Sequence, residues 1–329
     1  MKVVVTGSSG YIGGQICLQL KDAGHEVHGI DFVSPPRHLS DVCDSVTLAD
    51  YASTHALGRL VGLQPDAVVH CAATSLVGPS IKDPSTYYNN NVVKFVKLVD
   101  ILKQALPRVR FVFSSSAATY GQPENSVCTE QDRVHPISAY GASKLIAEHI
   151  LEHYNWAYGL NYVAFRYFNA CGADSRGRHG QAPGASHIIA RVLESLRDSQ
   201  EFVLYGTDYD TADGTCVRDY VHVEDIARAH VMAVSSMPGA PGSFNIMPGV
   251  YNLGSGRGIS NREIIDAAQA IVGRQLRLTT GPRRPGDPAT LIADSSWFDA
   301  ESQQPWRQHS IDSIIQTAWN WYVRSNKKI

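Results

Sequence analysis

The stretch KVVVTGSSGYIG, from Lys2 to Gly13, decides the fold of this chain. Its first part, Lys2–Thr6, is a short β-branched run of the kind that forms a strand buried on both faces of a parallel sheet. Gly7 and Gly10 follow at once, and apolar residues at helical spacing come after them. A strand, a glycine turn and a helix in this order bind a pyrophosphate, because the backbone can approach it closely and the helix N–H groups point at the anion.

A second strand, Glu26–Asp31, ends in an acidic residue. Asp31 follows Gly13 at about the separation at which such a unit places the carboxylate that holds the adenosine ribose. A carboxylate there repels a 2′-phosphate, and Arg37 is the only nearby cation that could hold one. The sequence therefore predicts NAD rather than NADP as the cofactor.

The overall composition is that of an ordinary globular protein of about two domains. The chain has 329 residues, of which 43% are apolar, and a net charge of −2. No basic block predicts a nucleic-acid partner, and no apolar run approaches the ~20 residues that span a bilayer. Six scattered cysteines without a C-x-x-C pair indicate reduced thiols and argue against a structural zinc. We expect a cytoplasmic enzyme with no metal, nucleic-acid or membrane partner.

Strand and helix patterns alternate through the first half of the chain, which predicts right-handed crossovers and one parallel sheet. The expected strands after the second are Ala67–Ala73, Arg110–Ser114 and Tyr162–Arg166, and the expected helices are Tyr87–Leu106 and Ser143–Tyr154. The predicted fold is α/β, with a Rossmann-type doubly wound parallel sheet. Ligands of such sheets bind beyond the carboxyl ends of the strands.

The composition becomes loop-rich after Asn169, which suggests a smaller second part. Gly172–Ser186 is expected to be a loop. It is followed by expected helices at Ile188–Leu196, Val223–Ser235, Ser260–Val272 and Ile311–Val323, with one strand at Phe202–Tyr205. We expect a NAD-binding Rossmann domain over residues 1–168 and a smaller α/β substrate-binding domain over residues 169–329. Some segments of the second half are expected to return to the first domain.

Tyr140 and Lys144 stand four residues apart at a predicted helix start, so their side chains share one face. A phenol with a pKa near 10 is a poor base at neutral pH. A nearby ammonium and the positive nicotinamide ring are expected to lower that pKa. Ser114–Ser116, at the end of a predicted strand, offers hydroxyl donors for a proton path. The sequence thus predicts a tyrosine base with a lysine that also holds the nicotinamide ribose.

These motifs resemble the extended short-chain dehydrogenase/reductase family and, within it, the UDP-glucose 4-epimerases (UDP-galactose 4-epimerases), almost end to end. Besides the glycine turn and the Tyr140–Lys144 pair, the resemblance is carried by FSSSA (Phe113–Ala117), YG (Tyr120–Gly121), RYFN (Arg166–Asn169), DGTCVRDYVHV (Asp213–Val223), YNLG (Tyr251–Gly254) and RRPGD (Arg283–Asp287). The last motifs are typical of members that act on nucleotide sugars. The resemblance implies NAD-dependent epimerisation at C4 of a UDP-sugar through a transient 4-keto intermediate, and hence a role in galactose metabolism.

The resemblance also implies roles for individual residues. Tyr140 would be the base, Ser116 would share the proton of the sugar 4-hydroxyl, and Lys144 would hold the cofactor. The residues expected to line NAD are Gly7, Gly10, Tyr11, Ile12, Gly13, Asp31, Asp50, Tyr51, Cys71, Ala72, Ala73, Asn90, Ser114, Tyr140, Lys144 and Tyr167. The residues expected to line the UDP-sugar are Ser115, Ser116, Tyr140, Asn169, His187, Tyr205, Arg218, Arg284, Asp287 and Leu291.

The chemistry of the residues expected at the nucleotide agrees with these roles. Arg218 and Arg284 carry guanidinium forks that suit a diphosphate. Tyr205 could lie against uracil, and Asp287 could accept hydrogen bonds from ribose hydroxyls. Two simpler interpretations stay open: a local ion pair between Arg218 and the next residue, Asp219, and ordinary core packing for Tyr205.

Three positions depart from the family pattern. Ser75 replaces a lysine near the cofactor, and Phe32 replaces an asparagine after the ribose-binding acid, so two cofactor contacts are expected to be missing or weaker. Leu291 stands at the position that gates the sugar pocket. A bulky aromatic residue there goes with plain hexoses and a small residue with N-acetyl sugars, so the intermediate Leu291 leaves UDP-GlcNAc and UDP-GalNAc open as substrates.

Three other functions are compatible with parts of this sequence. Epimerisation at C4 of a UDP-pentose or of a UDP-uronate stays open as an alternative. A nucleotide-sugar 4,6-dehydratase needs a further acid and base, which its relatives carry just after the serine or threonine of this strand end, whereas Ser116 is followed by Ala117-Ala118-Thr119. A non-catalytic NAD-binding scaffold would have no use for a proton path. By resemblance we also expect a homodimer that pairs the helices at Tyr87–Leu106 and Ser143–Tyr154.

Overall fold

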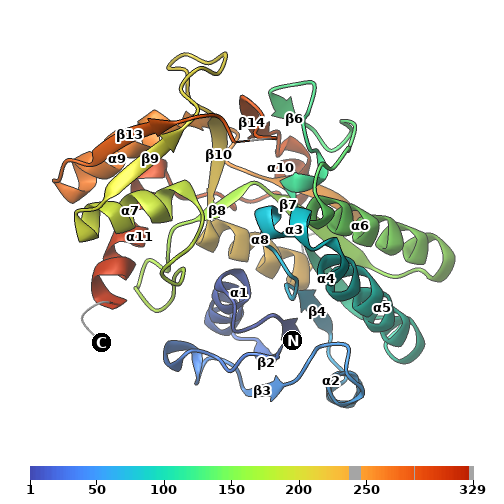
Figure 1. The fold of residues 1–329 in the computed structure, drawn as a ribbon. Helices are drawn as coiled ribbons and strands as arrows, with labels where there is room; N and C mark the ends of the chain where they lie inside the picture. Colours follow the sequence, from blue (N-terminus) through green and yellow to red (C-terminus); the bar gives the residue numbers. More distant parts are fainter. Residues whose placement is uncertain (237–245, 285, 326–329) are drawn as a thin grey trace.

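A parallel sheet of seven strands forms the centre of the first part of the molecule (Figure 1). The computed structural model describes residues 1–236, 246–284 and 286–325. The strands are β1 (Lys2–Thr6), β2 (Glu26–Asp31), β3 (Ser45–Leu48), β4 (Ala67–His70), β5 (Arg110–Ser116), β7 (Tyr162–Tyr167) and β11 (Gly249–Leu253). Their order is β11-β7-β5-β4-β1-β2-β3, and each neighbouring pair is parallel. The predicted doubly wound parallel sheet is confirmed.

Helices cover both faces of this sheet because its strands are apolar on both sides. Val3 and Val5 of β1 belong to an apolar cluster with α1 (Tyr11–Asp22) and α8 (Val223–Ser235). Val4, which points the other way, belongs to a second cluster, beneath the helices of the opposite face. These are α2 (Thr54–Leu63), α5 (Lys94–Ala105) and α6 (Ala139–Tyr158).

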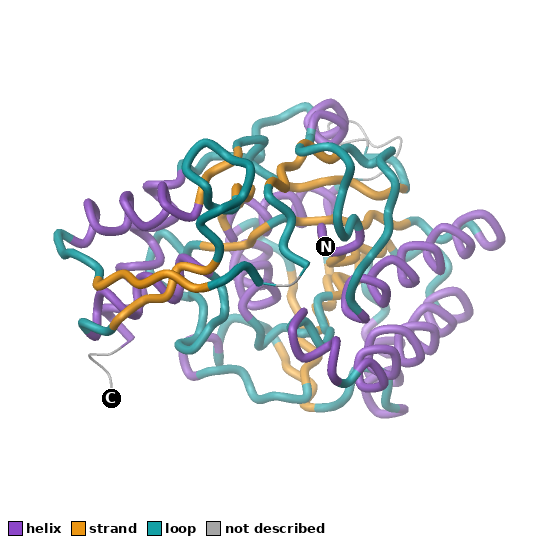
Figure 2. Tube along the Cα trace, turned by 45° about the horizontal axis from the view of Figure 1, so that its top comes forward, coloured by secondary structure: helices purple, strands orange, loops and turns teal. Residues whose placement is uncertain are grey.

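Two small sheets and several helices make up the second part of the molecule. One sheet has the order β12-β10-β14-β6, with β8 also paired to β10, and the other pairs β13 with β9. The bounds are β6 (Val127–Cys128), β8 (Asn169–Cys171), β9 (Glu201–Tyr205), β10 (Val217–His222), β12 (Gly258–Ser260), β13 (Arg277–Gly281), β14 (Thr290–Ala293), α7 (Ile188–Asp198), α9 (Asn261–Val272), α10 (Ser296–Ser302) and α11 (Ile311–Ser325). Figures 1 and 2 show β9 and β13 at the end of the molecule opposite α5 and α6.

Two predicted helices differ from the structure in ways that matter for the site. The segment expected as one helix at Tyr87–Leu106 begins earlier, at α4 (Pro84–Tyr88), and contains a π-helical stretch at Asn89–Val93 before α5. Helix α6 begins at Ala139 rather than Ser143, capped by the Ser138 hydroxyl. The earlier start places both Tyr140 and Lys144 inside the helix.

The shorter elements include α3 (Val77–Lys82) and two 3₁₀ turns at Arg37–Leu39 and Ala117–Thr119. All six cysteines are unpaired. Within the described ranges, no helix is both long enough and apolar enough to cross a bilayer.

Helix α8 begins in a buried cluster of two histidines and two carboxylates. His222 caps the helix, its Nδ1 accepting from the Glu224 N–H at 3.0 Å. The His309 ring stacks on His222 at 3.8 Å between ring centres. Its Nε2 lies 3.1 Å from Glu224 and its Nδ1 lies 2.9 Å from Asp225. His222, Glu224 and His309 have ligand atoms within 4.8 Å of one another, as a metal site would, but these hydrogen bonds already engage both nitrogens of His309.

This arrangement predicts a pH-dependent contribution to stability. Burial opposes the charge on His309, yet the hydrogen bonds to Asp225 and Glu224 raise its pKa to about 9. A raised folded-state pKa stabilises the fold fully below the unfolded value of about 6.5, and the gain disappears as the pH rises through 9. We therefore expect His309→Gln to lower the free energy of unfolding by about 1–3 kcal/mol in mildly acidic buffer.

Urea unfolding of both proteins across this pH range measures the difference. It should shrink from about pH 6.5 upward and vanish above about pH 9. A difference that stays constant with pH would show that the charge on His309 contributes nothing.

Candidate active site

The glycine turn forms a cradle that side chains would fill. Gly7 has φ +73°, and a Cβ on Gly13 would lie 2.1 Å from the Gly7 carbonyl oxygen. Gly10, the N-cap of α1, has no side chain to bond to the first N–H groups of the helix, and the His179 ring contacts the first turn at the Tyr11 carbonyl instead, at 2.9 Å. The Tyr11 phenol instead reaches the second part of the molecule and donates to the Gly172 carbonyl at 2.7 Å. The backbone at the start of α1 is thus shaped for an anion.

Asp31 ends β2 directly beside this turn. Its carboxylate accepts from the N–H groups of Ser9 at 2.9 Å and Val33 at 3.0 Å. These bonds hold the carboxylate at the sheet edge where an adenosine ribose would lie. The Phe32 side chain is 80% exposed and adds no polar group there.

Three other residues expected at the cofactor lie together in the first part of the molecule. The Tyr51 hydroxyl donates to the Asn90 carbonyl, and Lys94 donates to both Asp50 and the Asn90 side chain. The Asn90 amide also donates to the Thr74 hydroxyl at 2.9 Å. The π-helical stretch places Asn90 in this network, a role that helical periodicity alone could not predict. Ser75, in the same loop, is exposed.

The end of β4 approaches the glycine turn closely. A Cβ on Gly7 would lie 2.7 Å from the Ala72 nitrogen, so only glycine fits beside the Cys71–Ala73 run. The Ser114 hydroxyl, from the neighbouring strand, donates to the Cys71 sulfur at 3.0 Å. Tyr167 is buried, and the Ser114 side chain lies near its hydroxyl but does not meet it at normal hydrogen-bond geometry. A buried hydroxyl without a well-formed hydrogen bond suits a ligand that supplies one.

Tyr140 and Lys144 lie on α6 against the end of β5. The buried Lys144 Nζ donates to the Ser114 carbonyl at 2.6 Å. It also lies 5.9 Å from the centre of the Tyr140 ring. The Ser116 side chain forms a hydrogen bond with the Tyr140 phenol. The structure thus brings the predicted tyrosine, lysine and serine together at the carboxyl end of the sheet.

The protonation of the pair differs from the sequence-based expectation. Burial raises the pKa of the Tyr140 phenol, and the hydrogen bond from Ser116 only partly opposes this effect. Burial lowers the pKa of Lys144 to about 8, although nearby Cys71 and Glu148 act in the other direction. The spacing of Tyr140 and Lys144 reveals the nearby charge but not the loss of water around the phenol, which is the larger effect in the folded protein. In the protein alone the Tyr140 pKa is therefore not lowered.

Ser115 requires a correction. Its side chain is fully buried, and its hydroxyl donates to Glu148 rather than facing the site of Tyr140. Successive residues of a strand point to opposite sides, so Ser115 and Ser116 cannot both present their hydroxyls to one sugar. The Ser115 side chain is not available to a substrate.

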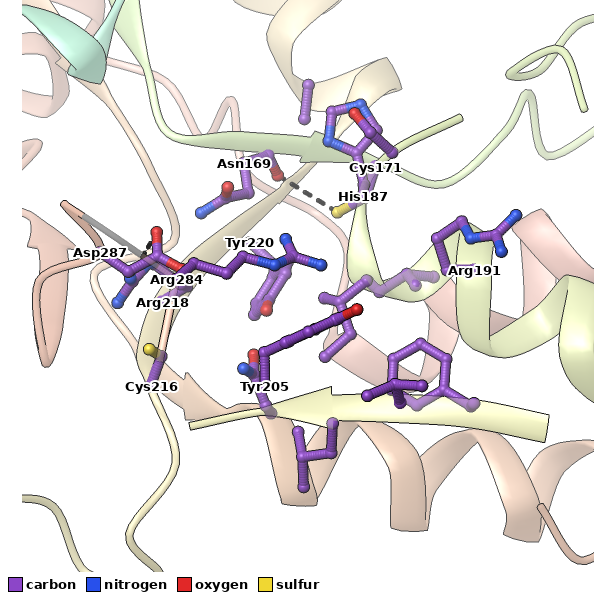
Figure 3. Close-up of a pocket in the computed structure, with 18 residues that line it drawn as sticks. Asn169, Cys171, His187, Arg191, Tyr205, Cys216, Arg218, Tyr220, Arg284 and Asp287 are labelled. Carbon is purple, nitrogen blue, oxygen red and sulfur yellow. Dashed lines mark hydrogen bonds and ion pairs between the residues drawn. The ribbon is translucent and has the colours of Figure 1, made fainter. Parts of the chain in front are cut away.

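A pocket in the second part of the molecule collects most of the residues expected at the UDP-sugar (Figure 3). Its lining includes Asn169, His187, Tyr205, Arg218, Arg284 and Asp287. Arg284 reaches over the Tyr205 ring at 4.8 Å, and an Arg218 Nη atom lies 3.6 Å from an Asp287 carboxylate oxygen. Pro285, within the RRPGD motif, lies outside the described residues.

The geometry decides between the interpretations of Arg218 and Tyr205 that the sequence left open. The Asp219 carboxylate accepts from the N–H groups of Ser255, Gly256 and Ala293, while Arg218 pairs with Asp287 instead. Tyr205 is 39% exposed, so it is not a core residue. Both side chains are therefore turned to the pocket.

A short run of chain connects the sheet end that carries Ser116 to the strands that line the pocket. Tyr167 is in register with Ser116, and Asn169, two residues later, is in register with Tyr220 of β10. Leu291 of β14 is in register with Arg218 and packs against the cluster that contains Ala117. Leu291 thus contacts the cluster at the 3₁₀ turn that follows Ser116 and is a register neighbour of Arg218, but it is not among the residues that line the pocket.

Sequence reasoning missed several residues that line the pocket. Arg191 follows His187 by one turn of α7, and Tyr220 follows Arg218 on the same face of β10. Asn261 and Phe202 line it as well. Helical and strand periodicity applied outward from His187 and Arg218 could have found Arg191 and Tyr220.

Comparisons with known proteins give one consistent result. The model of the NAD dependent epimerase/dehydratase family matches residues 3–254. A UDP-glucose 4-epimerase of Lactobacillus helveticus is 39% identical over 98% of this chain and 97% of its own length. The structure of the Bifidobacterium longum UDP-glucose 4-epimerase with NAD+ and UDP superposes with a TM-score of 0.89, at 30% identity and full coverage of both chains. The Stenotrophomonas maltophila UDP-glucose 4-epimerase, with NAD and formylated UDP-arabinopyranose, gives 0.91 at 30% identity, again with full coverage of both.

Proposed function

Because this chain belongs to the NAD dependent epimerase/dehydratase family, we infer that it catalyses NAD-dependent epimerisation at C4 of a UDP-sugar. The observation that carries this inference is the placement of Tyr140 and Lys144 at the serine-rich end of β5. This end belongs to the same sheet edge as the glycine turn and leads directly to the arginine pocket. The proposed substrate pair is UDP-glucose and UDP-galactose.

The cofactor is NAD, and the chain's own features fit it. The glycine cradle leaves room for a pyrophosphate at the start of α1, and Asp31 offers carboxylate oxygens to ribose hydroxyls. The buried Tyr167 hydroxyl and the Lys144 ammonium are the groups we propose for the nicotinamide end. When bound, NAD supplies a hydride acceptor at C4 and later returns the hydride to the opposite face.

The chain's residues handle the proton and the position of the sugar. Tyr140 takes the proton of the 4-hydroxyl as the C4–H bond breaks, which leaves a 4-keto sugar, and it returns the proton in the second half of the cycle. Ser116 forms a hydrogen bond with the same phenol and shares that proton. The ammonium of Lys144 favours the phenolate form of Tyr140 by its charge. The net redox change is zero, so one bound cofactor serves many turnovers.

The nucleotide must stay anchored while the keto sugar turns over. Arg218 and Arg284 are proposed to hold the diphosphate, with Tyr205 against uracil and Asp287 on the ribose. Asn169 and His187 line the same pocket. Neutralising two phosphates with guanidinium forks fixes the UDP moiety and leaves the sugar free to rotate.

The direct test is to incubate the protein with UDP-galactose and follow UDP-glucose by nuclear magnetic resonance. We expect the same equilibrium mixture of the two sugars whether the reaction starts from UDP-galactose or from UDP-glucose. UDP-GlcNAc, UDP-glucuronate and UDP-xylose, tested side by side, identify the sugar class that is used fastest. Absence of interconversion for all of them would contradict the proposed function.

A 4,6-dehydratase starts with the same oxidation but must also remove water across C5 and C6. The residues that follow Ser116 form a 3₁₀ turn of Ala117, Ala118 and Thr119, which carries no carboxylate. A product that has lost water would identify the dehydratase instead.

Leu291 is proposed to set the size of the sugar that fits. It lies on β14 in register with Arg218, a pocket residue, and packs against the cluster that contains Ala117. Leu291→Tyr adds an aromatic ring there, so we expect the kcat/KM for UDP-GalNAc to fall about tenfold more than that for UDP-galactose. Kinetics with both sugars measure this ratio, and equal losses for the two sugars would contradict the assignment.

We propose three further properties. Residues 1–168 form the NAD-binding domain and residues 169–329 the nucleotide-sugar domain, with α8 and β11 returning to the first.

The chain forms a cytoplasmic homodimer through the α4–α6 region. Val93, Ile146 and Trp156 of this region are exposed, Trp156 by 71%. Light scattering measures the molar mass in solution and so tests the dimer. The mass of a monomer at micromolar concentration would contradict this proposal.

A further inference from the structure

Helix α6 carries a buried carboxylate, Glu148, in line with the two residues already assigned. Tyr140, Lys144 and Glu148 are spaced by four residues, so they lie along one face of the helix. Glu148 is 2% exposed, and the mechanism above gives it no role. A carboxylate is rarely buried in this way without a charged partner.

The three side chains meet the three consecutive serines of β5. The Tyr140 phenol pairs with the Ser116 side chain, and Lys144 donates to the Ser114 carbonyl. Glu148 accepts from the Ser115 hydroxyl, the group that proved unavailable to substrate. The contact of Glu148 therefore belongs to the same interface between α6 and β5 as the contacts of Tyr140 and Lys144.

Arg166 holds Glu148 from the next strand. It lies on β7 in register with Ser115. Its Nε donates to both carboxylate oxygens, at 3.0 and 3.2 Å, and its Nη2 donates to one of them at 2.6 Å. Its Nη1 donates to the Tyr120 hydroxyl at 3.1 Å, which in turn donates to Asn252. Arg166 is only 6% exposed, so this fork cannot shift without leaving a buried charge unpaired.

We propose that Glu148 is a positioning residue of the epimerase, which, held by Arg166 and Ser115, fixes α6 along β5 so that Tyr140 and Lys144 reach their serines. Two described groups could act on Lys144 as anions, Cys71 and Glu148. Of these two, only Glu148 carries a charge at neutral pH. Burial raises the pKa of the Cys71 thiol to about 11 and lowers that of His70 to about 3, so both are neutral at neutral pH. Glu148 therefore favours the charged ammonium on which the phenolate depends.

The first test is Glu148→Gln, which keeps the size and an acceptor for Ser115 but removes the charge. We expect kcat to fall at least tenfold, with the KM for the UDP-sugar changed less than about threefold. We also expect the alkaline limb of the kcat/KM profile to move to lower pH, because Lys144 loses its proton more easily. Glu152→Gln, one turn further along α6, is the matched control and should leave both readouts unchanged.

The second test separates positioning from mere stability. The double substitution Glu148→Leu with Arg166→Met removes both charges, and such replacements often preserve or raise stability. We expect the double variant to fold and to retain NAD, while kcat stays low and the pH profile stays shifted. A double variant with normal kcat and an unmoved profile would overturn the proposal.

This inference rests on the proposed function, and the two fail differently. If the unmodified protein does not interconvert UDP-sugars, the proposed function itself is wrong. If the unmodified protein is active and the double variant is equally active, only the role of Glu148 is wrong.

Discussion

Tyr140→Phe is expected to lower kcat for UDP-galactose by a factor of about 10³, which lies within the range that general acid–base catalysis contributes. The substitution removes one oxygen and leaves the ring, which packs edge-on against Tyr87 at 6.5 Å between ring centres. Ser116 and Lys144 remain in place but have no comparable base to act on. The conversion rate measured with saturating substrate reports the effect.

Two controls keep this result specific. The content of bound NAD and the affinity for UDP should match those of the unmodified protein, because neither depends on the phenol proton. Tyr87→Phe removes a hydroxyl that donates to the Leu76 carbonyl, away from the proton path, and should retain most of the activity. A Tyr140→Phe variant with more than about a tenth of the normal rate would fall outside the range of general-base effects and would rule out Tyr140 as the base.

Arg218→Met is expected to raise the KM for the UDP-sugar about ten- to hundredfold, with a much smaller change in kcat. Hydrogen bonds to charged groups contribute about 1.5–3 kcal/mol, and each 1.4 kcal/mol is a factor of ten in affinity. Arg218 lines the pocket, and we propose that it holds the diphosphate, away from C4, so its loss is expected to weaken ground-state and transition-state binding alike.

Calorimetric binding of UDP provides the independent measurement, since it involves no chemistry at the sugar. Arg283→Met is the matched control: that guanidinium donates to the exposed Asp208 and lies outside the pocket lining. Equal losses of UDP affinity in the two variants would mean that general positive charge, rather than the fork of Arg218, holds the diphosphate.

The parts of the site that depend on local sequence were predictable. The glycine turn, the acid at the end of β2 and the four-residue spacing of Tyr140 and Lys144 each lie within one or two elements. Their chemistry follows from backbone geometry and helical periodicity. The alternation of strands and helices predicted the parallel sheet for the same reason.

The parts that depend on contacts between distant segments were not predictable. The Ser115 hydroxyl donates to Glu148, and Arg166 binds the same carboxylate. Arg166 lies on another strand, far from Ser115 in the sequence, so this contact could not be predicted from local patterns. The pKa of Tyr140 depends on burial by elements that pack only in the folded protein. The π-helical stretch at Asn89–Val93 depends on hydrogen bonds between the Asn90 and Asn91 side chains and Thr74, which no helical periodicity encodes.

These differences share a physical basis. A binding motif such as the glycine turn depends on the backbone conformation, and residues that are neighbours in the sequence determine that conformation. Side-chain orientation and protonation are decided by the whole fold. The proposed catalytic pair, Tyr140 and Lys144, could therefore be recognised from the sequence, whereas Glu148, the residue that we propose positions it, could be recognised only in the structure.

The central claim is that the hydrogen on C4 leaves the sugar as a hydride and returns to the same carbon. UDP-galactose with deuterium at C4 tests this most directly, with nuclear magnetic resonance of the UDP-glucose formed in ordinary water. The mechanism predicts that the deuterium is retained at C4 of the product and that none appears in the solvent. Replacement of the deuterium by solvent hydrogen would contradict it.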